Sequence, residues 1–248
     1  MKLVLEFYVL DIRLRRNAII MEVDLFMLVV LGTAITAAVS SSPNLYRTVR
    51  KNGFHRELFT KIFIPTSLID AKCECLIEEQ FPPGLYIDPY ELKNYREKGG
   101  PQFDSPAVDI EKPKELSPNL VFIIYPQQFT AIGPEYVTNV TVPVHIRYHQ
   151  PSSRYDTVQI QLKNPRLYLL CQVIDKSIQM NKKQFPCNSL DNNCLWTEIK
   201  YKTDVINIEF DVPVGSLHHQ GSVISVTLAV TIACCLYLSS KMLHTHVK

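Results

Sequence analysis

Two pairs of carboxylates in the sequence have the spacing that general acid–base chemistry requires. They are Asp109-Ile-Glu111 and Glu209-Phe-Asp211, and in a β-strand the two acids of each pair share a face. No glycine-rich phosphate loop, Gly-x-Ser-x-Gly motif or Asp-x-Asp motif accompanies them. We therefore interpret both pairs as solvated carboxylates on an outer face, and we expect no catalytic residues.

The densest group of polar side chains that could bind a ligand lies in Val144-His-Ile-Arg-Tyr-His149. His145 and Arg147 alternate along a predicted strand, so both should lie on its exposed face, and His149 should follow the strand end. Arginine is suited to bidentate pairing with a phosphate or with a partner's carboxylate. The alternative is an ordinary solvated strand face. We take His145, Arg147 and His149 as candidate partner contacts.

Five of the seven cysteines lie between two terminal apolar segments, where an oxidising compartment would favour disulfides. Cys187 and Cys194 flank a short polar loop and are the first candidate pair. Cys73 and Cys75 point to the same face of a strand and should not bond to each other, but one of them could reach Cys171. No Cys-x-x-Cys motif or matching histidine spacing is present, so we expect no metal site and no cofactor.

The elements that position these groups are predicted to be strands. In Val137–Tyr148 the residues Val140 to Tyr148 alternate between an apolar face and a polar face that carries Asn139 and Arg147. Pro143 cannot donate to a ladder, so this strand should lie at a sheet edge or carry a bulge.

Other segments show the same periodicity or a fully apolar run. Alternating segments are Leu58–Ile64, Val158–Leu162 and Ile206–Val214, and runs typical of doubly buried strands are Leu120–Tyr125 and Leu167–Val173. Glu91–Lys98 has room for two helical turns, and Lys93–Ser117 is rich in polar residues, Pro and Gly, which is typical of a long loop. The pattern predicts an all-β, sandwich-like lumenal domain plus one C-terminal transmembrane helix.

The predicted transmembrane helix is Gln220–Ser240, twenty-one residues without a charge. A helix needs about 20 such residues to cross a bilayer core. Small and hydroxyl side chains in this segment allow close approach to other membrane helices. We take Ser225, Thr227 and Thr231 as further candidate partner contacts.

Residues 1–40 are expected to form a cleaved leader, because the apolar run Leu25–Val39 is short and ends in small residues. The alternative is a signal anchor that remains attached. A leader and a C-terminal span place residues 41–219 in a lumen as a β-rich domain and 241–248 in a short cytosolic tail. The sequon at Asn139 predicts N-glycosylation there. The 26 basic and 24 acidic residues nearly balance, which argues against a nucleic acid partner.

Four stretches resemble the PIG-X family. They are Gly53-Phe-His-Arg56, Pro83-Gly-Leu-Tyr-Ile-Asp-Pro-Tyr-Glu-Leu92, Val144-His-Ile-Arg-Tyr-His149 and Val212-Pro-Val-Gly215. The resemblance covers the chain from about Lys51 to its C-terminus. Within it, Cys75 is an additional cysteine beside the family's usual one.

The resemblance implies a type I protein of the endoplasmic reticulum that is an accessory subunit of a mannosyltransferase. That enzyme transfers the first mannose from dolichol-phosphate-mannose to glycosylphosphatidylinositol (GPI) precursors. The implied partner is PIG-M, a multi-spanning catalytic subunit that this chain would bind and stabilise. Two alternatives remain, a β-sandwich receptor or adhesion protein at the cell surface and a catalytic glycosyltransferase chain.

Overall fold

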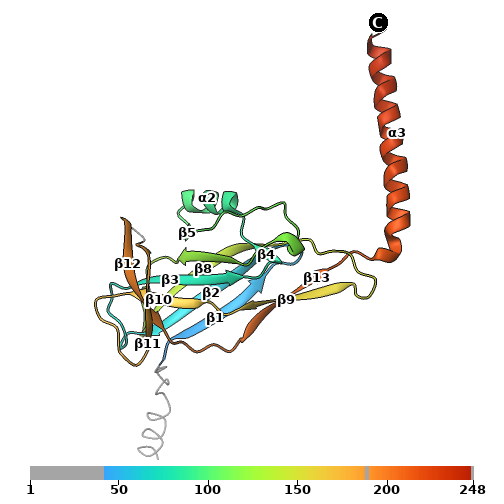
Figure 1. The fold of residues 1–248 in the computed structure, drawn as a ribbon. Helices are drawn as coiled ribbons and strands as arrows, with labels where there is room; N and C mark the ends of the chain where they lie inside the picture. Colours follow the sequence, from blue (N-terminus) through green and yellow to red (C-terminus); the bar gives the residue numbers. More distant parts are fainter. Residues whose placement is uncertain (1–41, 188–189, 247–248) are drawn as a thin grey trace, which may run out of the picture. The chain divides into compact units, whose positions relative to one another are not determined.

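The computed structural model describes residues 42–187 and 190–246, so the predicted leader lies outside the described residues. The described residues form antiparallel β-sheets, a short helix α2 and a long C-terminal helix α3 (Figure 1). The first sheet has five strands, in the order β1-β2-β8-β4 with β7 also on β8. Its strands are β1 (Asn44–Arg50), β2 (His55–Pro65), β4 (Leu85–Tyr86), β7 (Thr130–Ile132) and β8 (Glu135–Ile146).

The second sheet has six strands, in the order β11-β12-β10-β3-β6-β5. Its strands are β3 (Glu74–Phe81), β5 (Gln102–Asp104), β6 (Leu120–Tyr125), β10 (Arg166–Leu170), β11 (Gln179–Cys187) and β12 (Leu190–Ile199). A two-stranded sheet joins β9 (Thr157–Lys163) to β13 (Asn207–Pro213), with Phe210 opposite Ile160.

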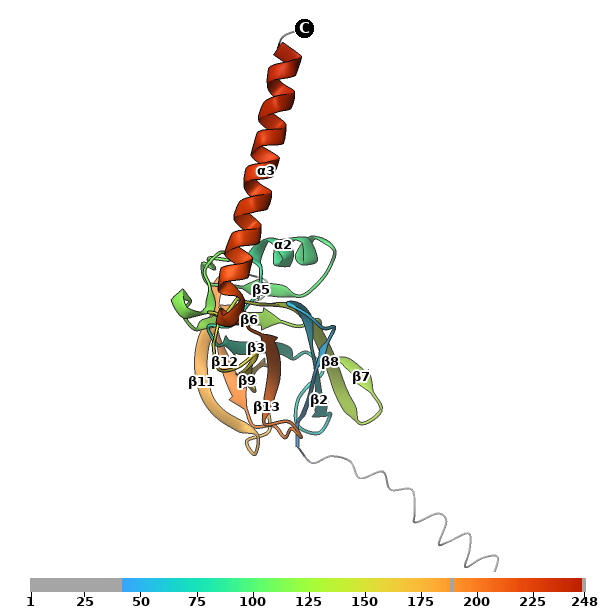
Figure 2. The ribbon, with the colours of Figure 1, turned by 90° about the vertical axis from the view of Figure 1, so that its right-hand side faces the viewer.

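The core lies between these sheets, because their alternating strands all turn an apolar face inward. The packed layers are visible in Figure 2. Apolar residues from all three sheets form one cluster, which includes Leu58, Ile62, Val142, Ile77, Phe81, Leu169, Leu162 and Phe210. The prediction of an all-β sandwich-like domain followed by one membrane-capable helix is confirmed.

Strand β3 is buried on both faces. Its second face contributes Leu76 to a smaller apolar cluster around Trp196. On that face the buried Glu78 accepts hydrogen bonds from the Tyr168 hydroxyl at 2.8 Å and from Lys183 Nζ at 2.7 Å. On the core face, the carboxylate of Glu79 is engaged by a buried arginine from the opposite sheet. A doubly buried strand with two acids therefore needs cationic partners from its neighbours.

That arginine is Arg47 of β1, whose Nη2 lies 2.7 Å from Glu79 Oε2. Both side chains are almost fully buried, at 0% and 1% exposure. Arg47 Nη1 also donates to the carbonyl of Lys163 at the end of β9. One guanidinium thus joins strands of all three sheets.

Strand β8 follows the predicted alternation from Asn139 to Ile146 except at Pro143, which is buried like its neighbours Val142 and Val144. We expected Arg147 on the exposed face and Tyr148 on the buried face, and both expectations are wrong: Arg147 is 4% exposed and Tyr148 is 74% exposed. The strand ends at Ile146, so the two-residue period no longer applies, and the Arg147 N–H donates to the carbonyl of Gly84. Pro143 pairs with Glu57 of β2. No described strand pairs with Pro143 on its other edge, as its missing N–H requires.

Two other predicted segments differ from the structure. The expected loop Lys93–Ser117 contains the end of α2, strand β5 and a short 3-10 helix η1 (Lys114–Leu116). The expected strand Leu167–Val173 ends at Leu170, where its pairing with β3 ends opposite Glu74, and the next residue, Cys171, is bonded to Cys73.

Helix α2 (Pro89–Glu97) begins where the sequence supplies a cap. The Asp88 carboxylate accepts a hydrogen bond from the Tyr90 N–H at 2.8 Å, and Pro89 occupies the first helical turn, where its missing N–H costs nothing. Leu92 is the one buried residue of this helix. Packing therefore contributes little to holding α2 against the sheet.

Two disulfides are present among the described residues. One joins Cys187 to Cys194 across the end of the β11–β12 hairpin, and the other joins Cys73 to Cys171, 98 residues apart. The choice between Cys73 and Cys75 is settled by position: Cys73 lies just before β3, whereas Cys75 lies within it and is buried as a free thiol. Burial raises the pKa of the Cys75 thiol to about 12.

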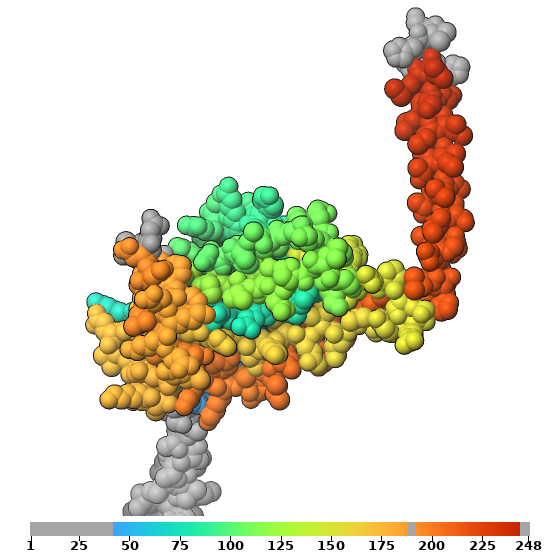
Figure 3. All heavy atoms as spheres, viewed as in Figure 1, coloured from blue at the N-terminus to red at the C-terminus, as the bar shows by residue number. Residues whose placement is uncertain are grey.

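Helix α3 (Gln220–His246) extends six residues beyond the predicted span. Within Leu217–Leu243, an 18-residue window has a mean hydropathy of 2.0, and the helix is long and apolar enough to cross a membrane. The side chains of α3 are exposed from Gln220 to Leu243 (Figure 3). An apolar helix that its own chain does not cover needs lipid or another protein around it.

Candidate functional site

A row of aromatic and cationic side chains crosses strands β2, β8 and β4. His55 and Tyr86 both lie opposite His145 in the strand register, so the three side chains share one face of the sheet. The two imidazole rings stack with centroids 4.5 Å apart, and the Tyr86 ring lies 5.1 Å from that of His145. The Arg147 guanidinium packs over the Tyr86 ring, 4.4 Å from the ring centroid.

Glu91 of helix α2 caps this row. Its carboxylate Oε2 lies 2.9 Å from His145 Nε2, and its Oε1 lies 3.4 Å from His55 Nε2. Glu91 and His145 are about one quarter exposed and His55 is about half exposed. The row is therefore open to solvent at its His55 end.

The buried position of Arg147 changes its expected role. Its Nη1 donates to the carbonyl of Lys112 at 2.6 Å, so the loop before η1 covers the guanidinium. Burial lowers the pKa of Arg147 from its ordinary value. Arg147 therefore stabilises the packing of this loop over the sheet, and it does not lie on a free surface.

Sequence reasoning singled out His145 and Arg147 here but missed His55, Tyr86 and Glu91. Three of the stretches that resemble the PIG-X family each contribute to this one row: Gly53–Arg56, Pro83–Leu92 and Val144–His149. The register of β2, β8 and β4 brings them together. Spacing along the chain does not predict this arrangement, because the row is assembled from three segments that are tens of residues apart in the sequence.

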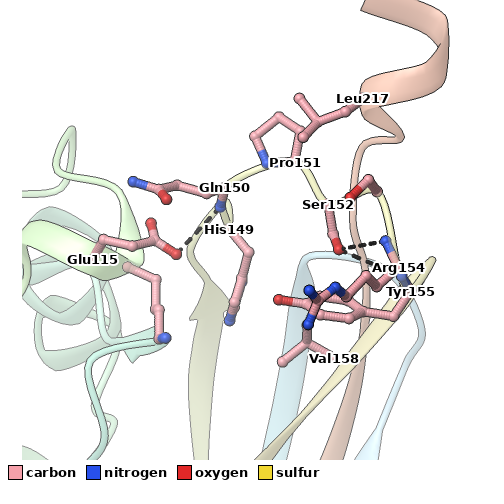
Figure 4. A pocket seen from close by; sticks show the side chains of 11 residues that line it. Glu115, His149, Gln150, Pro151, Ser152, Arg154, Tyr155, Val158 and Leu217 are labelled. Carbon is pink, nitrogen blue, oxygen red and sulfur yellow. Dashed lines mark hydrogen bonds between the residues drawn. The ribbon is translucent and has the colours of Figure 1, made fainter.

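His149 lies apart from the row, in a cavity of about 390 Å³. Its Nδ1 lies 3.1 Å from the Arg147 carbonyl. Residues 114–115, 149–155, Val158 and Leu217 line the cavity (Figure 4). In Figure 4, the Gln150 N–H donates to the Glu115 carboxylate. The Ser152 hydroxyl accepts hydrogen bonds from the backbone N–H groups of Arg154 and Tyr155.

The same loop holds the segment that leads into α3. Ser152 N–H donates to the Gly215 carbonyl at 2.8 Å, and Leu217 N–H donates to the Ser152 carbonyl at 3.0 Å. A further bond runs from Val214 N–H to the Asp156 carbonyl. These hydrogen bonds hold the chain against the β domain as far as Leu217, where the 3-10 helix η2 (Leu217–His219) begins.

The three hydroxyl residues predicted as contacts in α3 do not share a face. At 100° per residue, Thr227 and Thr231 lie together, and Ser225 lies on nearly the opposite side of the helix. Thr231 Oγ1 donates to the Thr227 carbonyl at 2.8 Å within the helix. On the side of Ser225, the small residues Ala229 and Ala233 follow at intervals of four.

The carboxylate pairs considered for acid–base chemistry are occupied in ordinary surface contacts. Gln159 Nε2 donates to Glu209 at 3.0 Å and to Asp211 at 3.5 Å, both on the exposed face of β13. Asp109 accepts a hydrogen bond from the Glu111 N–H in an exposed loop. Neither pair lines one of the described cavities.

The comparisons with known proteins give one consistent result. A family model described as PIG-X / PBN1 matches residues 51–243. A Homo sapiens protein named "GPI alpha-1,4-mannosyltransferase I, stabilizing subunit" is 36% identical over 205 residues, which are 79% of this chain and 78% of that protein. A Mus musculus protein of the same name is 35% identical over 191 residues, 74% of each chain. No solved structure matches the chain significantly.

Proposed function

Because the chain belongs to the PIG-X / PBN1 family, we propose that it is the stabilising, non-catalytic subunit of GPI alpha-1,4-mannosyltransferase I. The observation that carries the proposal is the extent of the similarity, which covers both the β domain and most of α3. The assignment makes the chain an accessory protein of a membrane enzyme. The surface contacts of its carboxylate pairs fit that role.

The partner in this proposal is a multi-spanning catalytic subunit of the PIG-M kind, which takes the first mannose from dolichol-phosphate-mannose. Deleting the gene for this chain should lower the abundance of that catalytic subunit and block the first mannosylation of the GPI precursor. Re-expression of the full chain should restore both. Unchanged abundance of the catalytic subunit after deletion would contradict the proposal.

We place the β domain on the lumenal side of the endoplasmic reticulum membrane, after removal of the leader, with one span and a short cytosolic tail. The position of Asn139 supports this orientation, because its side chain is exposed on β8 and can be reached by a glycosyl transferase. Replacing Asn139 with Gln should remove one endoglycosidase H-sensitive shift in gel mobility while leaving the protein folded. As a control, Thr141→Ala should reproduce the effect of the Asn139 variant, because it removes the same sequon. A wild-type chain whose gel mobility does not respond to endoglycosidase H would count against the lumenal assignment.

Helix α3 is proposed to contact the helices of the catalytic subunit. Its Ser225, Ala229 and Ala233 side carries only small side chains and allows close backbone approach to another membrane helix. The double change Ala229→Leu and Ala233→Leu should therefore reduce recovery of the catalytic subunit in mild detergent by about fivefold or more.

The matched control is Thr231→Leu, which adds bulk on the other side of α3. Recovery of the catalytic subunit with this variant should stay close to wild type. If the threonine variant disrupts the complex and the alanine variants do not, the contact lies on the Thr227 and Thr231 side. If neither has an effect, α3 acts as an anchor alone.

A further inference from the structure

We propose that His55, Glu91 and His145 form a binding site for a divalent transition metal ion, with Zn²⁺ as the best match. Two imidazole nitrogens and a carboxylate are a ligand set that Zn²⁺ takes in proteins. The three ligand atoms all lie within 4.8 Å of one another. The site goes beyond the stabilising role of the chain in the mannosyltransferase and does not depend on it.

The distances are close to those of such a site, and ligation requires the His55 ring to rotate out of its stack on His145. Ligands of a tetrahedral zinc ion lie about 3.3 Å apart when each bond is about 2.0–2.1 Å long. Glu91 Oε2 is 2.9 Å from His145 Nε2, and Glu91 Oε1 is 3.4 Å from His55 Nε2. The His55 side chain is 47% exposed, so it has room to rotate and leaves a fourth position open to water.

Each ligand is held by a separate regular element, as an organised metal site requires. The register of β2 and β8 places His55 opposite His145. Their imidazole rings stack with 16° between their planes, so the His55 ring must rotate out of this stack before both Nε2 lone pairs can point to one ion. Tyr86 stacks on the other face of His145. Glu91 lies in the first turn of α2, where the Asp88 cap fixes the helix start.

The charges around the cluster are mixed, because Lys51, which forms an ion pair with Glu57, also lies close enough to Glu91 to interact with it. Among the described residues, Glu91 supplies the carboxylate that contacts both imidazoles. The Arg147 guanidinium packs on the Tyr86 ring, 4.4 Å from its centroid. A bound ion would complete the contact between α2 and the sheet, which otherwise rests on Glu91 and the buried Leu92.

The test uses the full chain in mild detergent, first stripped of metal with EDTA and then titrated with Zn²⁺ alone. We expect one saturable ion per chain by calorimetry and elemental analysis, and slower amide exchange in Pro89–Glu97 when zinc is present. Co²⁺ in its place should give the visible absorption of a tetrahedral ion. Substitutions His55→Gln, Glu91→Gln and His145→Gln should each weaken zinc binding by at least about tenfold.

The matched control is His218→Gln combined with His219→Gln, a histidine pair outside the cluster, which should leave affinity unchanged. Glu91→Gln keeps the size and hydrogen-bonding capacity of the side chain, so it separates ligand loss from misfolding. If the cluster is only an imidazole–carboxylate contact that binds no metal, zinc will show no saturable binding and will not slow amide exchange in Pro89–Glu97. Either that result, or zinc binding that survives all three ligand substitutions, overturns the proposal.

Discussion

Replacing Arg47 with Met should lower the free energy of unfolding of the β domain by about 3–5 kcal/mol. The change leaves the Glu79 carboxylate buried without its cationic partner, 1% exposed, between two sheets. The single tryptophan of the chain, Trp196, is fully buried and reports unfolding by fluorescence during chemical denaturation. The measurement is a denaturant titration of wild type and variant in the same detergent.

The double variant Arg47→Met with Glu79→Leu is the control that identifies the cause. Removing both charges leaves no orphaned ion, and such replacements of buried pairs are often neutral or stabilising. Arg47 Nε and Glu79 Oε1 have no hydrogen-bond partner among the described atoms, so the double change removes two polar groups that are already incompletely satisfied. We expect the double variant to be at least as stable as wild type within about 1 kcal/mol. A double variant as unstable as the single one would show that packing, and not charge, causes the loss.

The cost of Arg47→Met should also depend on pH. Burial raises the pKa of Glu79 above its ordinary value, and Arg47 opposes that rise. Without Arg47 the folded-state pKa rises further, so the folded state binds a proton more tightly than the unfolded state does. The stability of the variant therefore falls as pH rises above the unfolded pKa. The variant should lose less stability relative to wild type at pH 5 than at pH 7.5.

The second large effect is expected from the disulfide between Cys73 and Cys171. It closes a loop of 98 residues, whereas Cys187–Cys194 closes one of seven. In the chain-entropy model these loops correspond to about 4.7 and about 2.4 kcal/mol of stabilisation. The double change Cys73→Ala and Cys171→Ala should therefore cost about 2 kcal/mol more than Cys187→Ala with Cys194→Ala.

In each variant the two cysteines of one disulfide are replaced together, so that no new free thiol is created. Cys75 remains, but burial keeps its pKa near 12, so it holds almost no thiolate and does not exchange with other disulfides. The measurement is the same tryptophan-monitored denaturation, under non-reducing conditions. Equal losses for the two double variants would refute the dependence on loop length.

The local features of this protein could be predicted from its sequence because they depend on neighbouring residues. The alternation in β2, β9 and β13 follows from the two-residue period of a strand. The length and lack of charge of Gln220–Ser240 predict a membrane-spanning helix. Those patterns were sufficient to predict the fold class and the membrane-capable helix near the C-terminus.

The contacts that give the protein its particular chemistry were decided only by the tertiary structure. Strand register brings His55 to His145, and α2 adds Glu91 between them. Arg147 is buried because a distant loop covers it, although its position in the alternation predicts an exposed side chain. No local period encodes which strands become neighbours, because pairing depends on the whole core. Local patterns therefore predicted the alternating strands and the membrane-capable helix, whereas the packing of the sheets fixed the remaining strands and the side chains that meet.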